Sequence, residues 1–173
     1  MPFMVEQFEG IEVQAWGHHH RTGREYDAWQ ESFALPALCG CRRPEDVPPA
    51  PYLRATATRD PLPGTFKVGI AWAGNPGNPE DAMRSTRLAD WAPVFAVPEV
   101  TFYGLQVVTN PASKQVAEAG VPVHDLSPEL RDWCDTAATL MELDLVIAVN
   151  CSVAHLAGAL GRPVWICLSA APE

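Results

Sequence analysis

Residues 145–161 read Leu-Val-Ile-Ala-Val-Asn-Cys-Ser-Val-Ala-His-Leu-Ala-Gly-Ala-Leu-Gly. The first five residues are all apolar, which is typical of a parallel strand buried on both faces. Residues 152–160 are mostly small and predict a helix that can lie close to a sheet. Gly161 indicates the end of that helix, because glycine readily takes the left-handed conformation of a helix C-terminus. A buried strand followed at once by a close-packed helix is the repeating unit of an α/β fold.

The same alternation runs upstream as far as residue 66 and downstream to residue 168. We expect further strands at residues 66–73, 100–108, 121–126 and 163–168, and further helices at residues 88–97 and 111–119 and from residue 127 onward. Five apolar strands alternating with four helices predict an α/β fold, a doubly wound parallel sheet of Rossmann-like type covered on both faces.

Capping residues support two of these helices. Asn110 is expected to cap the helix that opens with Pro111, and Gly120 to end it. Ser127 followed by Pro128 predicts the start of the next helix in the same way. That helix carries an apolar stripe expected to lie on the sheet, formed by Leu130, Trp133, Cys134, Ala137, Leu140 and Met141.

Residues 1–64 have a different character from residues 65–173. They include the proline-rich run 44–51, an alternating segment at 11–16 that predicts a strand, and a segment at 28–38 that predicts a short helix ending near Pro36. We interpret residues 1–64 as an incomplete N-terminal segment and hinge. Residues 65–173 then form the sheet domain, and the sequence stops so soon after the fifth strand that we expect a truncated C-terminus.

Composition excludes several classes of protein. The chain has 173 residues, of which 47% are hydrophobic and 19% charged, so it is expected to fold rather than remain disordered. Its net charge is −9, and its 12 Lys and Arg are scattered, which argues against nucleic-acid binding. The apolar runs are only as long as strands, so no membrane span is expected. Residues 1–6 lack the features of an export signal, which predicts a cytoplasmic protein.

The five cysteines are odd in number and show no pairing pattern, so free thiols are expected. Cys39 and Cys41 lie in the same segment as the three histidines at 18–20, which raises the alternative of a metal site. Zinc sites usually place two to four residues between paired cysteines, however, and this spacing is different. The prediction is that the chain holds no metal.

The loop after the first strand is one candidate binding element, because ligands of open parallel sheets bind beyond the carboxyl ends of the strands. It carries Gly74 and Asn75 at its start and Arg84 and Ser85 at its end. It matches neither the dinucleotide-binding fingerprint nor a P-loop. It is interpreted either as a phosphate-facing loop with Arg84 as the cation or as a plain surface loop.

The start of the helix after the fourth strand is a second candidate, since a helix N-terminus favours anions. It comprises Asn150, Ser152, Val153, Ala154 and His155. His155 is placed to donate to a phosphate oxygen, or else it is an ordinary structural histidine.

The third candidate is Asp125 in the loop 125–127. It is expected to lie beside the loop after the fourth strand and to meet a base or ribose, with a helix cap as the alternative.

These residues together resemble a known family. The segments 68–76, 84–85, 125–138 and 144–165 are similar to the nucleotide-sugar-binding half of family 9 glycosyltransferases, the heptosyltransferase-like enzymes. The likeness is greatest to the version found at the end of bacterial tetratricopeptide-repeat proteins. It covers about residues 66–173, and a weaker likeness at 26–36 and 51–54 extends to the hinge before that half.

The resemblance implies the second half of a GT-B fold and a sugar donor linked to ADP or UDP, with no other cofactor and no metal. Arg84 and Ser85 match positions that face the donor phosphates, and residues 152–155 match the helix start under the diphosphate. Asn150 stands where the family commonly has Asp, and Cys151 where a small hydroxyl residue is usual. The first half, which would hold the acceptor and the general base, is nearly absent, so no catalytic residue is named.

Three functions follow from this reading. The first is a glycosyltransferase-like domain that binds a nucleotide sugar but is not expected to transfer sugar alone. The second is a degenerate module that acts through protein contacts, with a second copy or a partner covering the missing half. The third is another GT-B enzyme, such as a sugar-nucleotide epimerase, which would share the diphosphate site.

Overall fold

The computed structural model of the protein describes residues 7, 35–47, 49–107 and 112–169. The strand predicted at 11–16, the histidines at 18–20 and the cap at Asn110 lie outside these residues. Of the helix predicted at 28–38, the described part is α2 (Leu35–Leu38). Pro36 lies within this helix and does not end it, because proline is tolerated in a first turn, where its missing N–H has no partner to lose.

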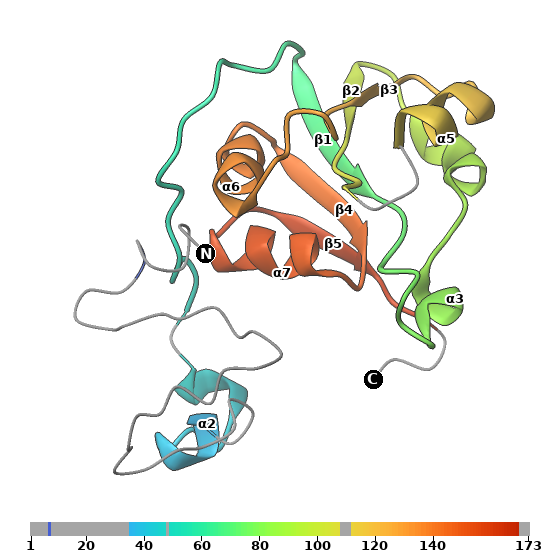
Figure 1. Cartoon of the computed structure of the whole chain (residues 1–173). Coiled ribbons are helices and arrows are strands. Elements are labelled where there is room, and N and C mark those ends of the chain that lie inside the picture. Colours follow the sequence, from blue (N-terminus) through green and yellow to red (C-terminus); the bar gives the residue numbers. More distant parts are fainter. Residues whose placement is uncertain (1–6, 8–34, 48, 108–111, 170–173) are drawn as a thin grey trace, which may run out of the picture.

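The five predicted strands form one sheet, as Figure 1 shows. They are β1 (Phe66–Ala71), β2 (Val100–Gly104), β3 (Val123–Asp125), β4 (Leu145–Val149) and β5 (Val164–Cys167). All neighbouring pairs are parallel, and the order across the sheet is β3-β2-β1-β4-β5. The predicted doubly wound α/β fold is therefore confirmed. The chain begins in the middle of the sheet, builds outward to β3, and then returns to the other side of β1.

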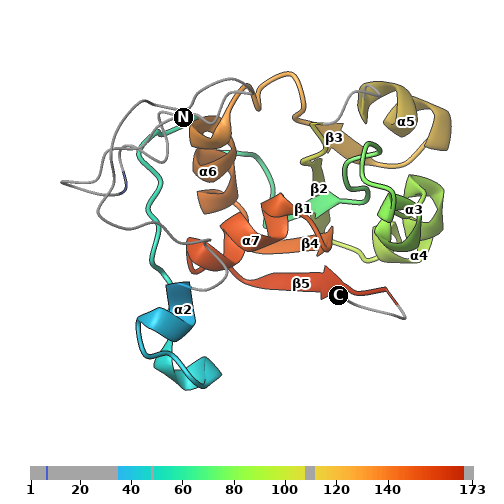
Figure 2. The same cartoon turned by 60° about the horizontal axis from the view of Figure 1, so that its bottom comes forward.

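Helices follow the strands in the predicted alternation. They are α3 (Asp81–Arg84), η3 (Leu88–Trp91), α4 (Ala92–Phe95), α5 (Ala112–Ala119), α6 (Trp133–Met141) and α7 (Ser152–Ala159), and a 3-10 turn, η2 (Pro44–Asp46), precedes the sheet. In Figures 1 and 2, α6 and α7 lie together on one side of the sheet, apart from α4 and α5.

Two hydrophobic clusters fill the two faces of the sheet. On one face Ile70 and Trp72 of the first strand region pack with Trp91 of η3, in a cluster that also includes residues near α4 and α5. On the other face Ala71 packs with residues of α6 and α7. Gly69 faces this second cluster, where a Cβ would collide with the side chains of Leu105 and Leu143. The alternation along β1 thus supplies both faces of the core.

The helix predicted to begin at Ser127 begins at Trp133 instead. Asp125 explains the difference, because its carboxylate accepts hydrogen bonds from the Ser127 amide (2.9 Å) and hydroxyl (3.0 Å). This local turn competes with a helix start. The cap of α6 is Asp132, whose carboxylate accepts from the amides of the first turn. With this later start, the predicted stripe residues Trp133 and Met141 are 43% and 42% exposed.

Several predicted boundaries also shift. β1 ends at Ala71 and β2 at Gly104, both earlier than predicted, while β3 starts later at Val123. The segment 88–97 is not one helix, because it divides into η3 and α4. Pro93 stands in the first turn of α4 and lacks the amide that would continue the preceding helical hydrogen-bond pattern.

The sheet is not covered on both faces at β5. Trp165, Ile166 and Leu168, along this strand and just after it, are 65%, 40% and 63% exposed. The register pairs Trp165 with Ile147 of β4, and Ile147 is itself only partly buried. The described helices therefore leave an apolar edge strand largely uncovered, contrary to the prediction for a fully enclosed sheet.

The last part of the predicted hinge, residues 51–64, runs as an extended strap along α6 to the start of β1 (Figure 1). The amides of Tyr52 and Leu53 donate to the Ala159 carbonyl. Arg59 donates to Thr139 Oγ1 (2.7 Å) and pairs with Glu129 (2.8 Å). The boundary at residue 64 stays a prediction, and the strap on its N-terminal side is bound closely to the sheet domain.

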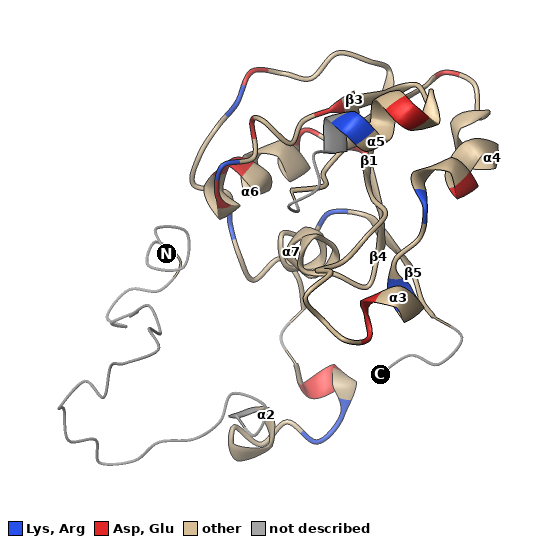
Figure 3. Ribbon diagram, turned by 45° about the vertical axis from the view of Figure 1, so that its right-hand side comes forward, with Lys and Arg blue, Asp and Glu red and all other residues tan. Residues whose placement is uncertain are grey.

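None of the helices in the described residues is long and apolar enough to cross a membrane. Charged side chains of both signs are distributed over the surface, without a basic stripe along the described ribbon (Figure 3).

Tyr103 gives a pH-dependent test of the strap. Its hydroxyl donates to the Pro63 carbonyl, and burial raises the pKa of this phenol above its ordinary value of about 10. Its contribution to stability is therefore fully present below pH 10 and is lost as pH rises through the folded-state pKa. We expect Tyr103→Phe to lower the free energy of unfolding by about 0.5–1.5 kcal/mol at pH 8 and to reduce the loss of stability between pH 8 and pH 11.

Urea unfolding at the two pH values measures both effects. Tyr52→Phe is the matched control, because Tyr52 is 61% exposed, and it should keep the full alkaline loss. An alkaline loss in Tyr103→Phe equal to that of the unmodified chain would contradict this role.

Candidate functional site

A crevice of about 410 Å³ opens beyond the carboxyl ends of β1, β2 and β4. Its volume falls within the range of small-molecule sites, about 300–1,000 Å³. The order β3-β2-β1-β4-β5 means that the strands are added first on one side of β1 and then on the other, so the strand order reverses between β1 and β4. Open α/β sheets bind ligands at this switch point, because the loops on its two sides diverge there.

Arg84, at the end of α3, faces the crevice and reaches across it to the far side. Its Nη1 donates to the Asn150 carbonyl at 3.5 Å, which links the loop after β1 to the loop after β4. Its Nε lies 3.6 Å from Asp81 Oδ1, and its side chain is 21% exposed. The guanidinium is thus a positive charge in the crevice wall that solvent screens only partly.

The start of the same loop surrounds the end of β1. Gly74 and Asn75 both line the crevice. The Gly74 amide donates to Ser85 Oγ at 2.8 Å, and a Cβ at Gly74 would collide with Asp81 Oδ1. Ser85 lies outside the lining, so in this structure its hydroxyl holds the loop rather than facing the crevice.

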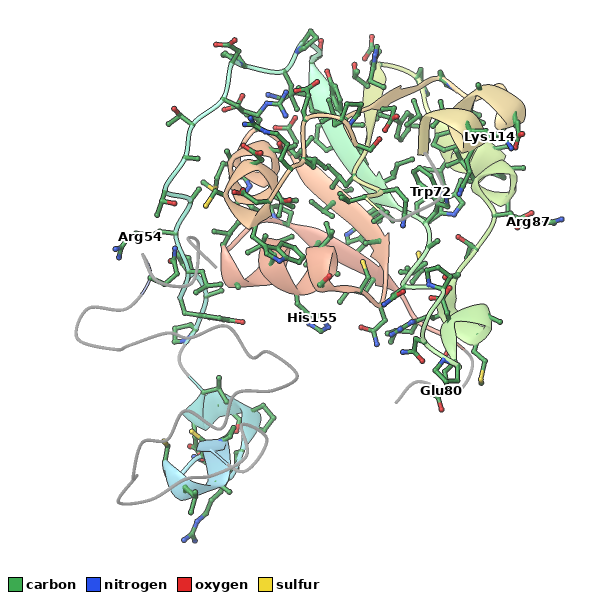
Figure 4. All side chains as sticks on the ribbon, in the orientation of Figure 1. Arg54, Trp72, Glu80, Arg87, Lys114 and His155 are labelled. Carbon is green, nitrogen blue, oxygen red and sulfur yellow. The ribbon has the colours of Figure 1, made fainter. Side chains whose placement is uncertain are left out.

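The start of α7 supplies the opposite wall. Ser152 and Val153 line the crevice together with Cys151, the N-cap residue. Ala154 is buried inside the helix packing. His155 is exposed, lies outside the lining, and projects from α7 away from the sheet in Figure 4. The structure thus brings Gly74, Asn75, Arg84, Ser152 and Val153 together and leaves His155 apart.

Asp125 does not lie beside α7, contrary to the prediction. β3 is the edge strand, and both β2 and β1 stand between it and β4. The carboxylate of Asp125 is engaged by Ser127, and it does not cap a helix either, since α6 starts at Trp133. The sequence order of the strands concealed this separation, because β3 precedes β4 along the chain without being its neighbour.

Gln106 is a site residue that the sequence analysis missed. It is 4% exposed, and its side chain donates to the Ala73 carbonyl (2.9 Å) and accepts from the Ala73 amide (3.1 Å). The Gln106 side chain therefore satisfies the backbone amide and carbonyl of Ala73 beyond the end of β1, where no backbone of β2 pairs with them. The available signal was an amide side chain between Leu105 and Val107, in the apolar second half of the run 100–108.

The loop before α6 and the first residue of that helix form the remaining wall, with Leu130, Arg131, Asp132 and Trp133 in the lining. The hydrogen bond from the Arg131 guanidinium (2.9 Å) lowers the pKa of the Asp135 carboxyl. Within the described part of the chain, no three His, Cys, Asp or Glu side chains gather as a metal site would require.

A comparison with curated proteins finds one related sequence. The chain is 32% identical to Protein FlbA of Caulobacter vibrioides over 104 residues, which is 58% of this chain and 17% of that protein. The chain therefore spans less than a fifth of the length of this relative. No protein-family model and no solved structure matches the chain.

Gln106→Leu tests the support of the crevice floor. The change keeps the approximate volume but leaves the Ala73 amide and carbonyl without their partner, so we expect it to lower the free energy of unfolding by about 1–3 kcal/mol. Val107→Ala is the control. Val107 is the next residue along the chain and its side chain is 53% exposed, so we expect this substitution to change the free energy of unfolding by only about 0.5 kcal/mol. Chemical denaturation compares the two, and equal effects would show that the Gln106 hydrogen bonds contribute little.

Proposed function

We propose that the crevice binds a nucleoside diphosphate or a nucleotide sugar linked to ADP or UDP. The observation that carries the proposal is that Arg84, which contacts the Asn150 carbonyl just before α7, lines the same crevice as Ser152 and Val153 in the first turn of α7, at the switch point of the sheet. Phosphates bind favourably to helix N-termini, where amides lack intrahelical partners and the helix dipole is positive.

The contrast between two helix starts supports this proposal. At α6 the Asp132 carboxylate accepts hydrogen bonds from the first-turn amides. At α7 the N-cap residue Cys151 makes no side-chain hydrogen bond to the first turn. An added anion would meet a carboxylate at α6, whereas at α7 it would meet amides and Arg84.

The rest of the crevice suits a nucleoside. Leu105, Leu130 and Trp133 contribute apolar surface to the lining, and aromatic side chains stack readily on bases. In this proposal the diphosphate lies between Arg84 and Ser152, and the base lies toward Trp133.

Binding without independent catalysis is the form of the proposal that the described residues favour. The only carboxylate in the described lining is Asp132, and it already accepts two amide hydrogen bonds. A general base for glycosyl transfer, or the acid and base of an epimerase, must be free to exchange a proton with its substrate. We therefore propose a glycosyltransferase-like donor-binding domain that does not transfer sugar on its own. The five free cysteines fit the cytoplasmic location that belongs to this proposal.

Calorimetric titration with ADP, UDP and a sugar derivative of each tests the binding site. Arg84→Ala should raise the dissociation constant about 10- to 100-fold, because it removes a charge-assisted contact. His155→Ala should leave it unchanged, because that side chain projects away from the crevice. The absence of saturable binding by every nucleotide would remove the proposal, and a loss confined to His155→Ala would place the site elsewhere on α7.

A protein-interaction module is the second candidate, and the exposed edge strand β5 favours it. A row of apolar residues on an unprotected edge is a surface that commonly pairs with another chain. Sedimentation velocity of the chain between 1 and 100 μM should then show reversible association that Trp165→Glu abolishes. A strict monomer over the whole range would count against this candidate.

A further inference from the structure

The side chains of Asp81 and Arg84 face each other on α3, three residues apart, behind the wall of the crevice. Arg84 Nε and Asp81 Oδ1 are 3.6 Å apart, too far for a good hydrogen bond. Both atoms are buried, and neither has a hydrogen-bond partner among the described residues. Buried polar atoms are nearly always hydrogen-bonded, so a facing pair of unpartnered atoms requires an explanation.

The arrangement divides the guanidinium between two neighbours. Its Nε side faces Asp81, which is outside the crevice lining and whose side chain is 15% exposed. Its Nη1 side reaches the Asn150 carbonyl at the start of α7. Figure 3 shows the acidic and basic parts of α3 next to each other. The Asp81 carboxylate, which lies outside the crevice lining, therefore partly offsets the positive charge that Arg84 presents to the crevice.

We propose that Asp81 determines the affinity and charge selectivity of the anion site by competing with a ligand phosphate for Arg84. This inference rests on the proposed diphosphate site. Two carboxylate or phosphate groups close to one guanidinium repel each other, so a bound anion must overcome the internal carboxylate. A diphosphate can do so by contacting Arg84 and the first turn of α7 at once. A singly charged anion has no such second contact.

The loop has room for this exchange. Gly74 lacks the Cβ that would collide with Asp81 Oδ1, so the carboxylate can seat against the end of β1. The segment that leads into Asp81, residues 75–80, contains Gly77 between two prolines, and it includes local turns in which the Gly77 amide donates to Asn75 Oδ1 and the Glu80 amide to Asn78 Oδ1. Asp81 belongs to α3 and not to a strand, so a rotation of its side chain away from Arg84 does not interrupt the pairing of the sheet.

Asp81→Asn distinguishes two roles of Asp81: competition with a ligand phosphate for Arg84, and support of Arg84 in its position. We expect the dissociation constants of inorganic pyrophosphate and of ADP to fall about fivefold to tenfold, since one opposing charge is removed at short range. Asp81→Ser should show the same gain, and Asp81→Glu should bind no more tightly than the unmodified chain. Asp90→Asn is the matched control, because Asp90 pairs with Arg87 at the same spacing, on the surface and outside the crevice. It changes the net charge equally and should leave both constants unchanged.

The gain must also depend on Arg84. In an Arg84→Ala background, Asp81→Asn should improve binding by less than twofold, as a double-mutant cycle requires for residues that act on each other. Weaker or unchanged binding by Asp81→Asn, with ADP still bound by the unmodified chain, would overturn the inference and leave the proposed function standing. Tighter pyrophosphate binding by Asp81→Asn, without any preference for ADP over pyrophosphate, would support the inference and overturn the proposed nucleotide site. No binding of either probe by any variant would overturn both.

Discussion

The burial of β1 on both faces is the constraint on which the rest of the structure depends. Ile70 and Trp72 face one cluster while Gly69 and Ala71 face the other, so a single layer of helices could not complete the core. The chain covers the first face with η3, α4 and α5 as it builds toward β3. It must then return past β1 to cover the second face with α6 and α7. Right-handed crossovers make this reversal the usual solution for a central parallel strand. The crevice lies at the point of reversal, so its position follows from the need to cover both faces.

The same reversal decides which residues share the site. The loop after β1 and the loop after β4 are distant in sequence, yet β1 and β4 are paired neighbours. Arg84 reaches from one loop to the Asn150 carbonyl of the other. In a chain with net charge −9, long-range electrostatics disfavour the approach of an anion, and binding must rely on local groups. A guanidinium and a helix start that act over a few ångströms are groups of that kind, because salt screens them less than surface charges.

Sequence patterns predicted the bounds of strands and helices well where neighbouring residues alone determine the local structure. The bounds of β4 and the start of α7 agree with the sequence prediction, because an uninterrupted apolar run changes there to small residues within a few positions. The start of α6 was predicted six residues too early, since the Asp125 side chain engages Ser127 in a turn that competes with the helix signal of Ser127 and Pro128. Strand order is a property of the whole sheet, so the distance between Asp125 and α7 was not readable from either segment. Gln106 was missed for the same reason, because its partner Ala73 becomes a neighbour only when β1 and β2 are paired.

The two departures from the resembled family bear differently on binding and on catalysis. Asn150 contacts Arg84 through its backbone carbonyl, and that contact survives a change of side chain from Asp to Asn. Cys151 serves as the N-cap through its backbone conformation, without a side-chain hydrogen bond. The proposed anion binding uses backbone amides and one guanidinium, and neither substitution removes these groups. Catalysis depends instead on side chains that are free to exchange protons, and the one carboxylate in the described lining is fixed as a helix cap. The proposed donor binding thus depends on groups that these two substitutions leave in place, whereas transfer would need a side chain that the described lining does not offer, so binding and catalysis are tested separately in this chain.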